Sequence, residues 1–163
     1  MTGPAEILAL LVRRSATLAV AESLTGGMIG AALTSVPGSS AAFRGGVLAY
    51  ATDLKHRLLG VDAGLLAREG AVHPEVAAEM AVGVRTLTGA TYGLAVTGVA
   101  GPEPQDGRPV GTVHIAVAGP DGRLWHRDLR LTGGREEIRG ETVSRALELL
   151  GGVLAAKTGE QSG

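Results

Sequence analysis

The chain of 163 residues contains no cysteine. Disulfide bridges, thiolate zinc sites, iron–sulfur clusters and cysteine nucleophiles are therefore excluded. Aromatic residues are scarce as well, with one Trp, two Tyr and one Phe. Leu, Val, Ile and Ala must fill the core, and a nucleic-acid surface that stacks bases on clustered aromatic rings is not expected.

Neither sign of charge is in excess. Fifteen basic and sixteen acidic residues give a net charge of −1, which supplies no long-range attraction to polyanions or anionic membranes. No uncharged apolar run approaches the roughly 18 residues of a membrane span, and Arg13 and Arg14 follow the first apolar run instead of preceding it as in a signal peptide. We expect a soluble, cytoplasmic protein that binds neither nucleic acid nor membranes.

The length predicts one domain. Apolar spacing and the positions of Gly and Pro predict helices over residues 4–14, 28–33 and 135–150. Two further helices are predicted to begin at residues 52 and 74. Strands are predicted over 17–21, 43–51, 92–96, 111–118 and 124–131, the last two as a hairpin that brings His114 and His126 face to face. This order predicts an α/β fold with a mostly parallel sheet, helices on both faces and a C-terminal hairpin. Residues 1–150 would form the domain, and the polar, glycine-rich residues 151–163 a flexible tail.

Three predicted strands end in polar residues, and ligands of open α/β sheets bind beyond the carboxyl ends of the strands. Ser23 follows the first strand on a tight turn, Tyr50 ends the second, and Thr97 ends the third. Taken alone, Ser23 is explained as a helix N-cap, Thr97 as a turn residue and Tyr50 as a half-buried ring. Together they predict a site with Ser23 as nucleophile, beside the backbone N–H groups of Thr25, Gly26 and Gly27, which could hold an oxyanion or a phosphate.

A serine nucleophile needs a base, and Lys55 is the candidate. The chain has thirteen Arg but only two Lys, Lys55 and Lys157, and only Lys can plausibly lose its proton. The positions three and four residues from Lys55 on a helix carry no carboxylate, so burial could lower its pKa. With only two lysines in the chain, the position of Lys55 is also explained by chance.

Other motifs are weaker. No histidine lies in a pattern typical of a Ser-His-Asp hydrolase, and a phosphate-binding Walker sequence is absent. The stretch from Thr25 to Gly30 is a degenerate form of the dinucleotide fingerprint without its acidic partner, so a nicotinamide dinucleotide cofactor is not expected. Arg135 and Arg139 lie one helical turn apart; they form a solvated face or jointly meet a phosphate.

Six segments in order resemble the CinA C-terminal domain family over about residues 5 to 150. They are Ala21–Gly27, Pro37–Ser40, Tyr50–Lys55, Gly70–Pro74, Thr97–Pro102 and Pro109–Val113. Members of this family include the nicotinamide mononucleotide deamidases. The resemblance implies a three-layer α/β/α sandwich on a mixed sheet, and the deamidation of nicotinamide mononucleotide to nicotinate mononucleotide and ammonia in pyridine nucleotide salvage. It implies no metal and no organic cofactor, and a homo-oligomer, a dimer or larger.

The resemblance also assigns residues. The family's catalytic serine, lysine and tyrosine fall on Ser23, Lys55 and Tyr50, and its small hydroxyl residue on Thr97. Ser40 matches a serine expected to line the site, and the segment holding Arg135 and Arg139 matches one expected to meet the phosphate. Tyr50 would position the amine or share its proton.

Two further expectations accompany this interpretation. Many relatives carry the domain behind a molybdopterin-binding-like domain linked to ADP-ribose pyrophosphatase activity; because Met1 directly precedes the first predicted helix, we expect that activity to be absent. The main alternative function is a catalytically silent nucleotide-binding or interaction module with the same fold.

Overall fold

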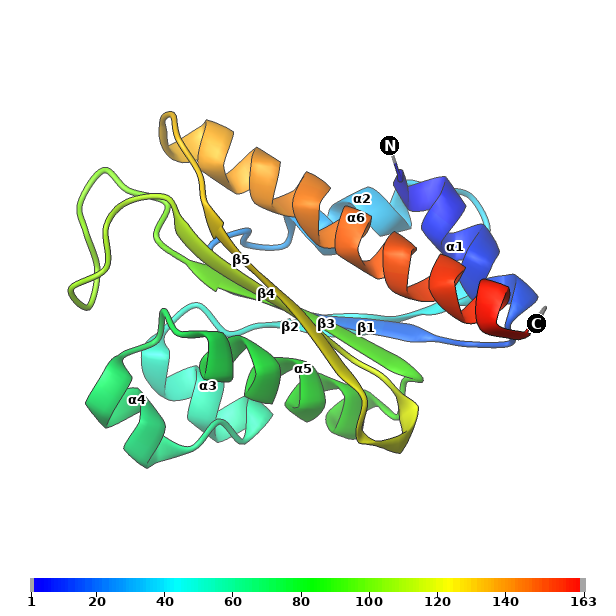
Figure 1. The fold of residues 1–163 in the computed structure, drawn as a ribbon, viewed down its shortest axis with the longest axis horizontal. Coiled ribbons are helices and arrows are strands. Elements are labelled where there is room, and N and C mark those ends of the chain that lie inside the picture. The colour runs from blue at the N-terminus through cyan, green and yellow to red at the C-terminus, as the bar shows by residue number, and fades with distance from the viewer. Residues whose placement is uncertain (1, 162–163) are drawn as a thin grey trace.

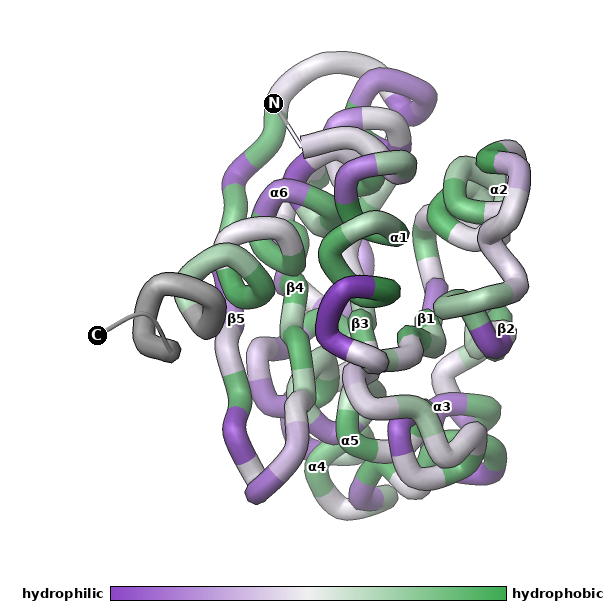
Figure 2. The backbone as a smooth tube through the Cα atoms, turned by 90° about the vertical axis from the view of Figure 1, so that its right-hand side faces the viewer, coloured by the Kyte–Doolittle hydropathy of each residue, from purple (hydrophilic) through white to green (hydrophobic). Residues whose placement is uncertain are grey.

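The computed structural model describes residues 2–161 of the chain and contains a five-stranded mixed sheet. The strands are β1 (Leu18–Glu22), β2 (Phe43–Leu48), β3 (Tyr92–Gly98), β4 (Thr112–Ala118) and β5 (Leu124–Arg130). They lie in the order β2-β1-β3-β4-β5, which Figure 2 shows across the molecule. Strands β2, β1 and β3 are parallel, and β4 runs antiparallel to both β3 and β5. The predicted sheet and its C-terminal hairpin are confirmed.

Helices cover both faces of the sheet, which confirms the three-layer sandwich (Figure 1). One layer consists of α1 (Pro4–Arg13), α2 (Met28–Thr34) and α6 (Arg135–Gln161). The other consists of α3 (Thr52–Leu59), α4 (Ala63–Glu69) and α5 (Pro74–Thr88). Short 3₁₀ turns, Ser39–Ala41 and Pro120–Gly122, precede β2 and β5. Within residues 2–161 no helix is long and apolar enough to cross a membrane.

The two faces of the sheet carry side chains of different size. Leu18 and Val20 of β1 pack with α1, α2 and α6 in one core, while Ala19 and Ala21 pack with α3, α4 and α5 in the other. Because successive residues of a strand point to opposite faces, the alternation follows from the sequence. The small residues let α5 lie close to the sheet. A Cβ built on Gly93 of β3 would be 2.2 Å from the carbonyl oxygen of Ala81 in α5.

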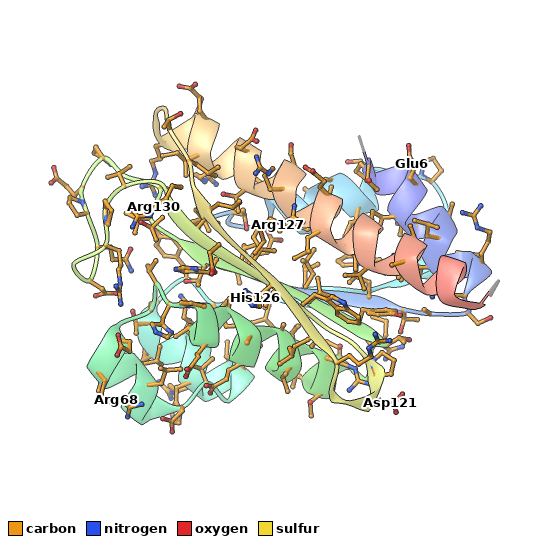
Figure 3. All side chains as sticks on the ribbon, in the orientation of Figure 1. Glu6, Arg68, Asp121, His126, Arg127 and Arg130 are labelled. Atoms are coloured by element: carbon orange, nitrogen blue, oxygen red, sulfur yellow. The ribbon has the colours of Figure 1, made fainter. Side chains whose placement is uncertain are left out.

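Strand β5 is an edge of the sheet and carries mostly polar side chains. His126, Arg127 and Arg130 lie along it and are exposed (Figure 3). Charged side chains on an edge strand oppose pairing with other chains. The register pairs His126 with Ala116 and His114 with Asp128, so the prediction that the two histidines face each other is wrong. His114 instead contacts the Asp128 carboxylate, with 2.7 Å between Nδ1 and Oδ1.

Two other differences concern helices. Helix α4 was not predicted, although Asp62 is a recognisable N-cap whose carboxylate accepts the Leu65 N–H at 2.9 Å. The predicted tail from residue 151 is wrong, because α6 continues to Gln161. Val153 and Leu154 are buried against the first core and give this last part of the helix an apolar face. Residues 162 and 163 of the predicted tail lie outside the described residues.

Candidate functional site

The turn after β1 places Ser23 at the carboxyl edge of the sheet, as predicted. The turn is closed by a hydrogen bond from the Gly26 N–H to the Ser23 carbonyl at 3.1 Å. Gly26 and Gly27 follow with φ of 55° and 103°, values that glycine adopts without the strain other residues would suffer. Ser23 is 7 % exposed, so its hydroxyl meets a sheltered environment.

Glu22 holds the other side of this turn. Its buried carboxylate accepts the N–H groups of Gly27, Ile29 and Gly30 at 3.0 to 3.1 Å, and so fills the start of α2 with a negative charge from the chain itself. The Gly27 N–H is consequently engaged by Glu22, and the Gly26 N–H by Ser23. Of the three donors expected to meet an oxyanion or phosphate, only Thr25's N–H has no acceptor among residues 2–161.

Lys55 extends from α3 to the same turn and is 1 % exposed. Its Nζ lies 2.9 Å from Ser23 Oγ, 2.7 Å from the Ala49 carbonyl oxygen and 3.2 Å from the Tyr50 carbonyl oxygen. A neutral amine has two N–H donors and one lone pair. The two carbonyls accept both donors, which leaves the lone pair to accept the Ser23 O–H. The surroundings of Lys55 therefore suit a base that takes a proton from Ser23.

Burial acts on the same amine. Desolvation lowers the pKa of Lys55 from 10.5 to about 8, and the negative charge of Asp106 opposes that shift. With a pKa of about 8, roughly a tenth of the molecules carry the neutral amine at pH 7. The predicted lowering of the pKa of Lys55 is confirmed in direction, and the neutral form is accessible near physiological pH.

A cavity of about 510 Å³ opens above Ser23, a size typical of small-molecule sites. Its walls come from the ends of three strands and from α6: Ser23, Leu24, residues 50–52, residues 98–105 and Arg135. Much of the lining is backbone and small side chains of the loop after β3, which leaves room for a flat ligand beside the hydroxyl.

Tyr50 and Arg135 form the outer rim of this cavity. The Tyr50 side chain is 63 % exposed, and its phenol oxygen accepts a hydrogen bond from Arg135 at 3.2 Å. Arg135 also donates to the Gly101 carbonyl. Tyr50 therefore positions the Lys55 amine through its backbone carbonyl, while its phenol bonds Arg135. Arg139 lies one turn further along α6, and its Nε donates to the Leu24 carbonyl at 2.9 Å.

Two predicted residues are not part of this arrangement. Thr97 is buried, and its hydroxyl donates to the Ala71 carbonyl at 2.8 Å, so its hydrogen is already used by the chain. Ser40 lies just before β2, whose first residue, Phe43, pairs with Leu18 at the start of β1. Because the strands are parallel, Ser40 is at the amino end of the sheet, opposite Ser23. The expectation that Ser40 lines this site is wrong within one copy of the chain.

Sequence reasoning missed two acidic residues, Glu22 and Asp106. A signal existed for Glu22, because an acid just before a Gly-Gly helix start is suited to accept free N–H groups. Asp106 lies in a glycine- and proline-rich loop and contacts residues 35 positions away, so no local pattern points to it. Among the side chains that the structure describes, those of residues 2–156, no group of three or more histidine and acidic residues is arranged to hold a metal ion.

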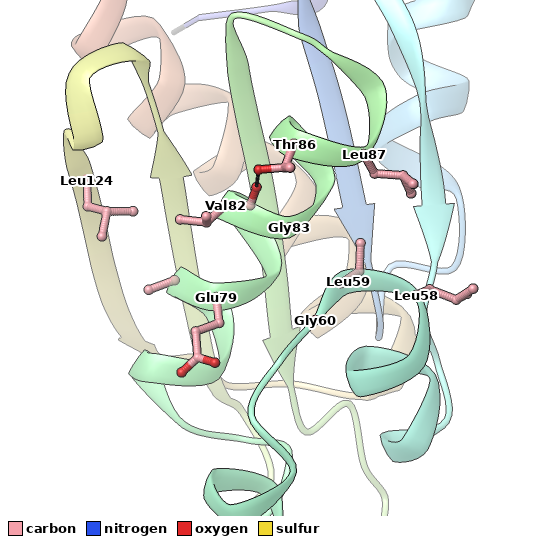
Figure 4. Close-up of a pocket in the computed structure, with 10 residues that line it drawn as sticks. Leu58, Leu59, Gly60, Glu79, Val82, Gly83, Thr86, Leu87 and Leu124 are labelled. Atoms are coloured by element: carbon pink, nitrogen blue, oxygen red, sulfur yellow. Dashed lines mark hydrogen bonds between the residues drawn. The ribbon is translucent and has the colours of Figure 1, made fainter.

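A second hollow of about 490 Å³ lies between α3, α5 and the start of β5 (Figure 4). It is lined mainly by aliphatic side chains such as Leu58, Val82 and Leu124. The Thr86 side chain also lines this hollow, and its hydroxyl donates to the carbonyl of Val82 in the same helix at 3.0 Å. Glu79 is its one charged lining residue within the described chain. These side chains offer no nucleophile and base pair, which distinguishes the hollow from the cavity above Ser23.

Known proteins share the sequence and the fold. Residues 2–154 match the CinA C-terminal domain family. A CinA-like protein of Frankia casuarinae is 61 % identical over 149 residues, which are 91 % of this chain and 34 % of that protein. A CinA-like protein of Synechococcus is 54 % identical over 147 residues, covering 88 % of this chain and 35 % of that one. The chain thus spans about a third of the length of these curated relatives.

Solved structures agree in fold along nearly the whole chain. The competence/damage inducible protein CihA from Agrobacterium tumefaciens has a TM-score of 0.87 and 39 % identity, covering 90 % of both chains. A CinA superfamily protein from Klebsiella pneumoniae has a TM-score of 0.88 and 36 % identity, covering 92 % of this chain and 94 % of that chain. The five-stranded mixed sheet and the helical layers on its two faces are therefore those of this superfamily. On these grounds the chain belongs to the CinA C-terminal domain family.

Proposed function

We propose that this chain is an amidohydrolase that deamidates nicotinamide mononucleotide with Ser23 as nucleophile and Lys55 as general base. The observation that carries the proposal is the 2.9 Å contact between Lys55 Nζ and Ser23 Oγ beneath a 510 Å³ cavity. The amine is buried and its pKa is lowered to about 8. A neutral lysine so placed activates a hydroxyl without help from histidine.

The proposed reaction has two halves. Ser23 Oγ attacks the carboxamide carbon while its proton moves to Lys55 Nζ, and the carbonyl oxygen becomes an oxyanion. The C–N bond then breaks, and Lys55 returns the proton to the leaving nitrogen, which departs as ammonia. Water attacks the resulting ester; Lys55 takes one of its protons and passes it to Ser23, so that the acid is released and the enzyme is restored.

The surrounding groups supply the other requirements of this mechanism. We assign the oxyanion donor to the Thr25 N–H, which follows Ser23 by two residues and has no acceptor in the described part of the chain. Arg135 lines the cavity and is exposed, so its guanidinium is available to the phosphate of the nucleotide. Arg139 supports the turn behind Ser23 through the Leu24 carbonyl. The Gly27 N–H, engaged by Glu22, has no role in this scheme.

Ammonia release from nicotinamide mononucleotide tests the proposal, with free nicotinamide and the dinucleotide as competing substrates. Ser23→Ala and Lys55→Met should each lower kcat about 10³-fold or more, since each removes one partner of the proton transfer. Ser40→Ala, at the other end of the sheet, and Lys157→Met are the matched controls and should keep full activity. Turnover retained by Ser23→Ala or Lys55→Met contradicts the mechanism. Calorimetric binding of the mononucleotide without ammonia release by the unaltered chain would favour the silent binding module.

A further inference from the structure

Asp106 lies near the tip of the loop that joins β3 to β4. Its backbone has a φ of 51°, a conformation that few residues other than glycine and Asn or Asp adopt. Backbone hydrogen bonds between Gln105 and Arg108, at 2.8 and 3.1 Å, close the tip of the loop around it. The preceding part of the same loop, residues 98–105, forms the wall of the cavity above Ser23. The position of that wall therefore depends on what holds the loop.

The Asp106 carboxylate fastens this loop to the connection between α4 and α5. Its Oδ2 accepts the Ala71 N–H at 3.0 Å, and the Ala71 carbonyl accepts the Thr97 hydroxyl at 2.8 Å. Gly70 makes room for the carboxylate, since a Cβ on it would be 2.7 Å from Asp106 Cγ. Ala71 is thus held on both sides, by the loop after β3 and by β3 itself.

The same carboxylate acts on the Lys55 amine through its charge. Many charged or titratable groups lie on the elements around Lys55: Glu22 beside Ser23, Asp53, His56 and Arg57 on α3, Arg68 and Glu69 on α4, His73, Glu75, Glu79 and Arg85 on and before α5, and Arg135 and Arg139 on α6. Of these and the nearby loop residues, the negative charge of Asp106 is the one that raises the pKa of Lys55 most clearly. Burial and Asp106 therefore act on the amine in opposite directions.

We propose that Asp106 is a positioning residue of this site: its carboxylate fastens the cavity wall to the α4–α5 connection and supplies the negative charge that the Ser23–Lys55 pair experiences. The kinetic consequence rests on the proposed amidohydrolase function, whereas the effect on the lysine does not. The two roles of the carboxylate are separable. Asn keeps an oxygen that accepts the Ala71 N–H but carries no charge, and Ala loses both.

The experiment measures the titration of Lys55 by NMR in the full chain, with lysine labelled at the side-chain carbon next to Nζ. Because the sequence holds only two lysines, the Lys157→Arg background leaves one signal. Asp106→Asn and Asp106→Ala should each lower the pKa of Lys55, because each removes the negative charge that raises it. Asp53→Asn, on an exposed acid two residues from Lys55, should leave it unchanged. Either Asp106 variant suffices if the other fails to fold.

Kinetics then separate the two roles. For Asp106→Asn, the rise of kcat/KM with pH should move to lower pH with KM within twofold, because less of the amine is protonated. Asp106→Ala should show the same movement and raise KM several-fold, because the loop keeps its Arg108–Glu69 contact but loses its bond to Ala71. An unaltered titration of Lys55 in both variants overturns the inference. If the titration moves but the unaltered chain releases no ammonia, the proposed function fails and the role of Asp106 stands.

Discussion

The chemistry at residue scale follows from burying one amine beside two carbonyl groups. Lys55 is 1 % exposed, and its nearest oxygens are those of Ser23, Ala49 and Tyr50. The fold therefore holds a group whose protonated form it disfavours, since burial lowers its pKa to about 8. That Ser23 and Lys55 meet was predictable, because each follows the carboxyl end of a neighbouring parallel strand. The contact of Asp106 with Ala71 was not, because it joins two loops through tertiary structure alone.

The lowered pKa predicts a pH-dependent stability. Between about pH 8 and 10.5, Lys55 binds fewer protons in the folded than in the unfolded chain. Lys55 therefore adds to the free energy of unfolding as pH rises through this range. Relative to Lys55→Met, the unaltered chain should gain about 3 kcal/mol across it, the equivalent of the shift from 10.5 to about 8. Urea denaturation of both proteins from pH 7 to 10.5 measures the difference, and a constant difference contradicts the prediction.

At the scale of elements, close contact between α5 and its neighbours positions the site. Gly83 faces α3, where a Cβ would be 1.9 Å from the Leu59 carbonyl oxygen. Since α3 carries Lys55, the spacing between the two helices helps set the position of the amine. The amphipathic pattern of the sequence predicted α5. The sequence could not show that α5 packs closely against α3, because the pairing of helices depends on the topology of the fold.

Gly83→Ala tests this contact. The added methyl group must push α3 away, so we expect a loss of about 1 to 3 kcal/mol in the free energy of unfolding, together with lower ammonia release. Gly152→Ala is the matched control in α6, where a Cβ meets nothing within 4 Å. It should stabilise the chain by about 0.5 to 1 kcal/mol, because Ala favours a helix over Gly. Chemical denaturation measures both variants. Equal changes in the free energy of unfolding would show that the close contact between α5 and α3 does not restrict the residue at position 83.

At the scale of the whole molecule, α6 ties the ends of the chain to the site. Its first turn places Arg135 on the cavity rim, and its last described core residues lie against α1 (Figure 1). Leu154 is fully buried there. The polar composition of residues 151–163 favoured a tail. This was wrong because Val153 and Leu154 are buried in the core that α6 shares with α1.

Leu154→Ala should destabilise the protein by about 2 to 5 kcal/mol, the cost of a cavity in a packed core. A flexible tail would predict almost none. Leu87→Ala, at a leucine that is 59 % exposed on α5, is the control and should change the free energy of unfolding by less than about 0.5 kcal/mol. Thermal and urea denaturation of the two variants provide the comparison.

The sequence by itself determined the alternation of strands and helices, the two-faced sheet and the Ser23–Lys55 pair, because these depend on local periodicity and on the rule that parallel strands end at one edge. Tertiary structure alone decided which backbone donors remain available, since Glu22 occupies the start of α2. It also decided that Ser40 lies at the far end of the sheet and that Asp106 reaches Ala71. Hydrogen bonds between distant segments have no sequence period, so only the folded chain reveals them.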